Sequence, residues 1–143
     1  MFRGQYNHTI DDKGRLIVPV KFREQLGEEF IVTKGFDPCL YVYPGAEWEN
    51  IEERFGEITS TGKQARKFAR FFFGSSTECE LDKQGRVLIP SVLREYAGLK
   101  KDVVLVGVRN RLEIWDADMW IEENSDDDIE ELAENMAALG LNI

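Results

Sequence analysis

The sequence predicts an α+β fold that is mainly β and is built from two similar halves. The segment 11–19 returns at 82–90, with Asp, Gly, Arg and Pro all displaced by 71 residues. In both copies, short runs rich in β-branched residues flank a tight polar turn. Between the copies, apolar residues recur at helical spacing. These three observations indicate a duplicated strand-rich unit joined by helices.

The duplication extends beyond these segments and sets the domain organisation. Arg23 matches Arg94, and after one inserted residue Trp48 matches Trp120 at an offset of 72. A chain of 143 residues holds one compact domain, whereas halves of about forty-five residues would each bury too little apolar surface alone. We expect a first repeat over 1–48, linker helices over 49–75, a second repeat over 76–120 and an acidic C-terminal helix over 121–143.

Each repeat is predicted to begin with two strands and a short helix. The strands cover 6–10 and 16–18 in the first copy and 77–81 and 87–89 in the second. Glycine at 14 and 85 suits a turn residue with positive φ. The proline that closes each second strand can start a helix, and a glycine follows each helical segment, so we expect helices over 20–26 and 91–97. The remaining strands are expected at 30–33, 40–43, 103–108 and 112–115.

The segment between the repeats predicts two helices. Apolar residues recur at helical spacing from Trp48 to Ile58 and again from Ala65 to Phe72, with a break at 59–62. The second helix also carries a basic stripe, which suits a solvated face, a phosphate contact or a subunit interface. The stripe consists of Lys63, Arg66, Lys67 and Arg70.

The C-terminal segment predicts an acidic amphipathic helix. Ser125 and the three aspartates at 126–128 are typical of a helix start, and the pattern ends at Gly140. Its apolar face is expected to pack against the body or against a neighbouring subunit. That face consists of Ile129, Leu132, Ala133, Met136 and Leu139.

Charge is distributed unevenly along the chain. The formal net charge is −9, but eleven of the 27 acidic residues and none of the 18 basic residues lie in 112–143. Residues 1–111 therefore carry 16 acids and 18 bases. A mildly basic body with an acidic tail fits a polyanion partner for the body, and it also fits a plain solvated tail.

The two Asp-x-x-x-Arg turns are the candidate binding loops. A carboxylate at Asp11 or Asp82 can accept turn amide protons and pair with the arginine four residues on, which orders the loop without any ligand. Pseudo-twofold packing of both turns would concentrate positive charge in one place. The residues that would form or extend this surface are Arg15, Arg86, Lys13, Lys83, Arg3, Lys21, Arg23 and Arg94, with Asp11, Asp82, Gly14 and Gly85 structuring the loops.

Several function classes are not expected. His8 is the single histidine, and the two cysteines, Cys39 and Cys79, fall at non-equivalent places in the repeat, so neither a metal site nor another cofactor is predicted. We expect no enzyme and no small-molecule substrate, because no nucleophile motif or glycine-rich phosphate loop is present. No run approaches the roughly twenty apolar residues of a membrane span, and we expect a cytoplasmic protein.

Together, the doubled Asp-x-x-x-Arg, the opening Met-Phe-Arg-Gly and the Arg-Leu-Ile-Val-Pro run resemble the MraZ family of bacterial transcriptional regulators, over nearly the whole chain. The resemblance implies two AbrB-like half-barrels with swapped hairpins, related by a pseudo-twofold axis. It also implies a homo-oligomeric ring, associated with the nucleoid, that binds tandem promoter repeats in double-stranded DNA. By the same resemblance the ring represses the division and cell-wall gene cluster, including its own gene.

The resemblance also bears on the residues. It implies that Arg15 and Arg86, with Lys13 and Lys83 beside them, contact DNA. An alternative function is an AbrB-like antitoxin or scaffold whose acidic C-terminal helix binds a basic protein. The charge split fits that alternative, whereas the complete second repeat fits it less well.

Overall fold

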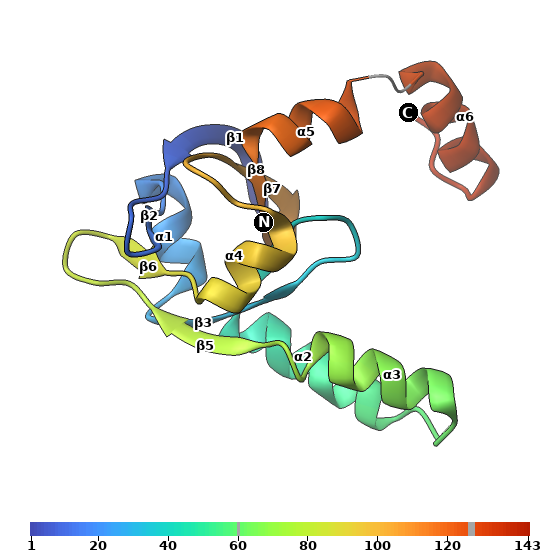
Figure 1. The fold of residues 1–143 in the computed structure, drawn as a ribbon. Coiled ribbons are helices and arrows are strands. Elements are labelled where there is room, and N and C mark those ends of the chain that lie inside the picture. Colours follow the sequence, from blue (N-terminus) through green and yellow to red (C-terminus); the bar gives the residue numbers. More distant parts are fainter. Residues whose placement is uncertain (60, 126–127) are drawn as a thin grey trace.

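A computed structural model describes residues 1–59, 61–125 and 128–143. The part of the chain that it describes holds eight strands and six helices (Figure 1). The first repeat and the linker together contribute β1 (Phe2–Thr9), β2 (Arg15–Ile17), α1 (Val20–Leu26), β3 (Glu29–Lys34), β4 (Leu40–Pro44), α2 (Gly45–Gly56) and α3 (Lys63–Phe72). The second contributes β5 (Thr77–Glu80), β6 (Arg86–Leu88), α4 (Ser91–Ala97), β7 (Asp102–Arg109), β8 (Arg111–Asp116), α5 (Ala117–Asn124) and α6 (Ile129–Ala138).

The two repeats exchange their first strands. The main sheet has the order β1-β7-β8-β4-β3-β5, so β1 lies beside a strand of the second repeat and β5 beside a strand of the first. β2 and β6 form a separate antiparallel ribbon, one strand from each repeat. Interchanging the repeats reverses the sheet order and leaves it otherwise unchanged. A pseudo-twofold axis therefore passes between β4 and β8, and the predicted α+β, mainly β fold with swapped hairpins is confirmed.

Alternation along the central strands divides the core into two layers. On one face of the sheet, side chains such as Phe30 and Val32 join those of α1, α4 and the ribbon. On the other face, the intervening residues such as Ile31 and Tyr43 pack against α2, α3 and α5. The side chains of a strand point alternately to its two sides, and helices cover each side, so both faces of the sheet are buried. Residues of both repeats therefore contribute to each layer of the core.

The short helices begin and end where their flanking residues require. α1 and α4 each follow a proline in extended conformation, Pro19 and Pro90, and each ends at a glycine with positive φ. Proline, which has no amide proton, is tolerated at the start of a helix, and glycine adopts positive φ at low cost. Both helices coincide with the predicted ranges 20–26 and 91–97.

The linker helices α2 and α3 form an arm that packs on the face of the sheet opposite α1 and α4 (Figure 1). The rings of Trp48 and Phe72 stack with centroids 5.3 Å apart, and those of Phe68 and Phe72 with centroids 5.2 Å apart. The hydroxyl of Thr33, on β3, donates a 2.6 Å hydrogen bond to the carbonyl of Phe72, which fixes the end of α3 on the sheet.

The C-terminal segment contains the predicted acidic helix, which ends before Gly140, and a further helix precedes it. Residues 117–124 form α5, and α6 begins at Ile129 with Asp128 accepting two amide protons as its N-cap. Residues 126 and 127 of the predicted helix start lie outside the described residues. All residues of α6 are exposed, so its apolar face does not pack on the body, and Figure 1 shows α6 standing apart. Of the described helices, none has both the length and the hydropathy of a membrane span.

Candidate nucleic-acid interface

The turn at 11–15 is held by one carboxylate. Oδ1 of Asp11 accepts the amide protons of Lys13 and Arg15 at 3.0 and 2.9 Å, and Oδ2 accepts the Nε proton of Arg15 at 2.7 Å. The Gly14 amide donates to the Asp11 carbonyl at 2.9 Å. Gly14 has a φ of 88°, a conformation that favours glycine. Asp11 therefore binds three donors of its own turn, and Gly14 adopts the conformation at which that turn reverses.

The turn at 82–86 repeats this arrangement. Oδ1 of Asp82 accepts the amide protons of Gln84 and Arg86, both at 2.9 Å, and its Oδ2 accepts the Arg86 Nε proton at 2.8 Å. One contact has no equivalent in the first turn. An Nη of Arg86 donates to Oε1 of Gln84 at 2.7 Å, whereas position 13 in the first turn is a lysine. The second arginine is therefore held more firmly than the first.

These hydrogen bonds lower the pKa of both aspartates. For Asp11 and for Asp82 the largest cause is the hydrogen bond from the backbone amide of the arginine four residues on. Donors that stabilise the charged form keep a carboxyl ionised. Both turns therefore hold an ionised aspartate at neutral pH, with an arginine paired to it.

Each turn is built on the other repeat. The Val18 amide donates to the Gly85 carbonyl at 2.9 Å, and the Ile89 amide donates to the Gly14 carbonyl at 2.8 Å. Arg23 donates from Nε to the Val18 carbonyl at 2.7 Å, and Arg94 donates in the same way to Ile89 at 3.0 Å. The two turns therefore form one interlocked unit rather than two independent loops.

The β2-β6 ribbon turns four side chains outward. Leu16 and Val87 are paired across the ribbon and are buried in the core. Because strand side chains alternate, their neighbours point to the opposite face. Arg15 stands opposite Leu88 and Arg86 opposite Ile17. We call Arg15, Ile17, Arg86 and Leu88 the ribbon face.

The arginines of the ribbon face remain accessible. The side chains of Arg15 and Arg86 are 34% and 25% exposed. Only Nε of Arg15 is bonded to Asp11, and among the described residues its terminal nitrogens have no partner. Diagonal neighbours in such a ribbon have Cβ atoms about 7–8 Å apart, so both arginines lie on the same face of the ribbon.

The ribbon face also contains two exposed apolar side chains that were not predicted to belong to the interface. Ile17 is 43% exposed and Leu88 is 58% exposed. Both lie in continuous apolar runs, which are typical of buried strands. A strict alternation count from the buried Leu16 and Val87 would have placed them outward, beside the arginines.

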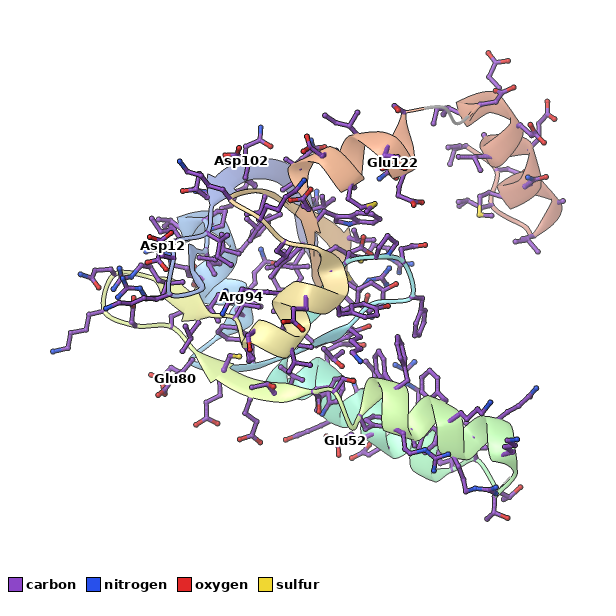
Figure 2. All side chains as sticks on the ribbon, viewed as in Figure 1. Asp12, Glu52, Glu80, Arg94, Asp102 and Glu122 are labelled. Carbon is purple, nitrogen blue, oxygen red and sulfur yellow. The ribbon has the colours of Figure 1, made fainter. Side chains whose placement is uncertain are left out.

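The other predicted basic residues lie at different distances from this face. Lys13 and Lys83 are exposed at the turns, and Lys21 is exposed in the first turn of α1. Arg3 is exposed near the start of β1, the end of that strand remote from Asp11, so the fold does not bring it to the turns. Figure 2 shows Asp12 at the turn end of the molecule, and Arg94 set further in.

Arg23 and Arg94 lie beneath the turns rather than on the ribbon face. Both are half-buried, and a side chain at position 85 would collide with the guanidinium of Arg23. A Cβ at position 14 would lie 2.9 Å from Nε of Arg94. Their positions fit support of the turns better than direct contact with a ligand.

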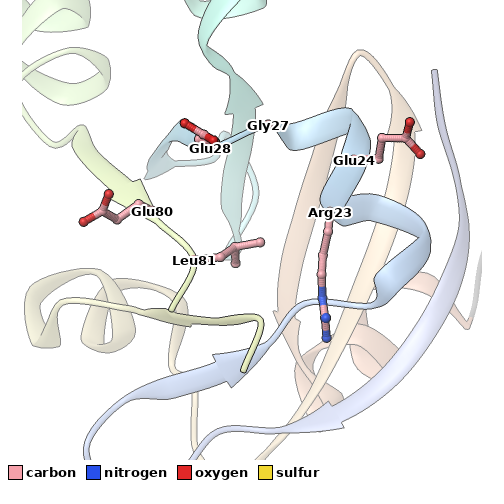
Figure 3. A pocket seen from close by; sticks show the side chains of 6 residues that line it. All are labelled: Arg23, Glu24, Gly27, Glu28, Glu80 and Leu81. Carbon is pink, nitrogen blue, oxygen red and sulfur yellow. The ribbon is translucent and has the colours of Figure 1, made fainter. Parts of the chain in front are cut away.

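A shallow hollow beside α1 is less suited to a polyanion. It has a volume of about 530 Å³ and lies next to Arg23, which points from α1 toward the turns (Figure 3). Three carboxylates line it, from Glu24, Glu28 and Glu80. Their charge would repel phosphate, so the candidate interface is the ribbon face and its turns.

Comparison with known proteins identifies the family. The family model described as "MraZ protein, putative antitoxin-like" matches this chain twice, over residues 1–71 and 72–139. The chain belongs to the MraZ family. A protein named Transcriptional regulator MraZ from Desulfitobacterium hafniense is 55% identical over 143 residues, with 99% of this chain and 100% of that protein covered.

Other MraZ relatives agree in name and extent. The Transcriptional regulator MraZ of Caldanaerobacter subterraneus subsp. tengcongensis is 54% identical over 138 residues, covering 95% of this chain and 96% of that protein. That of Thermoanaerobacter sp. is 52% identical over 143 residues. Membership of the MraZ family places this chain in a class of proteins that are not enzymes, as expected from its residues.

Proposed function

We propose that this chain is a sequence-specific, double-stranded DNA-binding transcriptional regulator. The observation that carries the proposal is the ribbon face, which presents two arginines and two apolar side chains on a rigid, interlocked base. The relatives named Transcriptional regulator MraZ support the same function. A two-stranded ribbon fits the major groove of B-DNA.

Each group on the ribbon face would have a distinct role in binding. The terminal nitrogens of Arg15 and Arg86 would contact phosphate oxygens or the O6 and N7 acceptors of guanine. Ile17 and Leu88 would contact thymine methyl groups, which are the apolar feature of the major groove. Lys13, Lys83 and Lys21 would add phosphate contacts around this centre.

A single ribbon would bind weakly, so affinity would come from assembly. We propose that chains form a homo-oligomeric ring that engages tandem promoter repeats, because linked sites raise the overall affinity by roughly 10²–10⁴ without new contacts. Bound upstream of the division and cell-wall gene cluster, which includes its own gene, the ring would repress transcription. The protein would then be cytoplasmic and associated with the nucleoid.

The test is a mobility-shift titration with the DNA upstream of the chain's own gene, together with light scattering to measure mass. We expect specific binding whose affinity falls steeply with salt. Replacement of Arg54, an exposed base on α2, provides a matched control and should leave the affinity unchanged. Equal affinity for promoter and unrelated DNA would contradict the proposal.

A further inference from the structure

Helix α6 has an apolar face without a cover. Its exposed apolar residues include Ile129 at 68%, Leu132 at 46% and Met136 at 42%. An isolated helix of ten residues is marginal in water, because its stability normally comes from packing an amphipathic face. The helix therefore requires a partner surface.

The chemistry of α6 defines that surface. Glu130 and Glu134 lie one turn apart beside the apolar face, Asp128 caps the start, and no basic residue occurs in the helix. A complementary surface would present apolar groups bordered by positive charge.

A surface formed by α3 and by the loop between β3 and β4 has this composition. Phe36 is 63% exposed, and its ring packs on Phe68 with centroids 6.1 Å apart. Phe68 and Phe71 are half-buried, so all three rings keep accessible surface. Helical spacing places Lys63, Lys67 and Arg70 along one border of this strip. We call these six residues the basic aromatic face.

The bases of this face, Lys63, Lys67 and Arg70, have no ion-pair partner in the part of the chain that the structure describes. α3 contains four basic residues and no acidic one, and α6 contains three acidic residues and no basic one. The two helices are therefore opposite in charge, and both surfaces carry exposed apolar side chains.

We infer that α6 of one chain docks on the basic aromatic face of a second copy of this chain. α5, which leads into α6, packs on β7 and β8, whereas α3 packs on β3 at the other half of the sheet. Figure 1 shows α3 and α6 at separate corners of the molecule. This separation favours a neighbouring chain over the same chain as the partner.

Such a contact joins two different surfaces, so each chain has one donor helix and one acceptor face. Repetition of a head-to-tail contact closes into a ring when the rotation permits, and otherwise extends as a filament. The inference rests on the proposed ring and names the surfaces that would hold it together. It also explains why α6 is exposed when a single chain is considered.

The test uses two full-length double variants and light scattering. Leu132→Glu with Met136→Glu disables the donor helix, and Lys67→Glu with Arg70→Glu disables the acceptor face. Each variant alone should be monomeric. A 1:1 mixture should give a dimer, because one intact donor and one intact acceptor remain. Ile121→Glu, the same kind of change at an exposed site on α5, should keep the wild-type mass.

Other outcomes overturn the inference. A monomeric wild type would mean that α6 folds onto its own chain or binds a different, basic protein. If the acceptor variant keeps the wild-type mass, α6 pairs with itself or another surface. A mixture that remains monomeric excludes the donor and acceptor pairing.

DNA titration of the same samples separates this inference from the proposed function. On DNA with one binding box, the monomeric variants should retain the affinity of a single wild-type subunit; on repeated boxes they should lose the multivalent gain of roughly 10²–10⁴. If no variant binds DNA but the masses follow the expected pattern, the assembly stands and the DNA-binding proposal fails.

Discussion

The guanidinium of Arg23, on the first repeat, lies against Gly85 in the turn of the second. Arg94 and Gly14 form the equivalent pair: a Cβ added at position 14 would lie 2.9 Å from Nε of Arg94. Each arginine also holds the strand end of its own repeat through a backbone carbonyl. The shape of each binding turn is therefore set by a side chain from the other half of the molecule.

The first prediction concerns these glycines. Gly85→Ala should destabilise the protein by about 1–3 kcal/mol, because the residue has positive φ and because its methyl group would meet the Arg23 guanidinium. Urea unfolding measures the change. Gly98→Ala is the control for the effect of positive φ alone. Gly98 has a φ of 62°, and no atom lies within 4 Å of a Cβ added there. Equal losses for the two variants would show that the contact with Arg23 is unimportant.

The second prediction concerns Arg23 itself. Arg23→Ala should remove a charged hydrogen bond worth about 1.5–3 kcal/mol and loosen the turn of the second repeat. Amide hydrogen exchange should then speed up at Gln84 and Arg86 more than at Lys13 and Arg15. The reverse pattern should hold for Arg94→Ala. If each substitution affected only its own repeat's turn, the cross-repeat support would be refuted.

The third prediction concerns pH. Because Asp11 and Asp82 have pKa values below their ordinary 3.8, their stabilising contribution is complete above that value. It is lost as the pH falls through the lowered folded-state values. Carboxyl ¹³C shifts should titrate with midpoints below 3.8, assigned with Asp11→Asn and Asp82→Asn. Midpoints at or above 3.8 would mean that the turns are not held this way in solution.

The fourth prediction concerns the ribbon arginines. Arg15→Ala and Arg86→Ala should each weaken specific DNA binding by about 1–3 kcal/mol and reduce the slope of log affinity against log salt by about one. Arg15→Ala should have the larger effect, because its terminal nitrogens are unpaired among the described residues while Arg86 is held by Gln84. Arg54→Ala is again the control. Variants with both affinity and slope unchanged would remove the two arginines from the interface.

The fifth prediction concerns Ile17 and Leu88. Replacing thymine by uracil in the bound site removes the methyl groups and should cost wild type about 0.8 kcal/mol, roughly fourfold in affinity, per contacted methyl. Ile17→Ser with Leu88→Ser should abolish this difference, and Ile121→Ser should leave it intact. Fluorescence anisotropy measures both affinities. A wild type that binds the two DNAs equally would exclude methyl contacts.

Local features explain what could be predicted from the sequence. The flanking Pro and Gly set the bounds of α1 and α4, and the Asp-x-x-x-Arg spacing defined the two turns. The position of Arg23 beneath Gly85 could not be read from the sequence, because the contact crosses 62 residues and depends on how the repeats pack. Arg3 lies far from the turns for a simpler reason: an extended strand separates residues that are only a few positions apart in the sequence.

The exchange of first strands between the repeats has a consequence for how the molecule can be divided. Cleavage in the loop between α2 and α3 would leave two fragments that remain hydrogen-bonded along β1-β7, β4-β8, β3-β5 and β2-β6. Each fragment would lack the strand that completes its own sheet, so each should recover it from a second molecule of its own kind. The arrangement is that of a two-chain homodimer in which both partners have been fused into a single polypeptide.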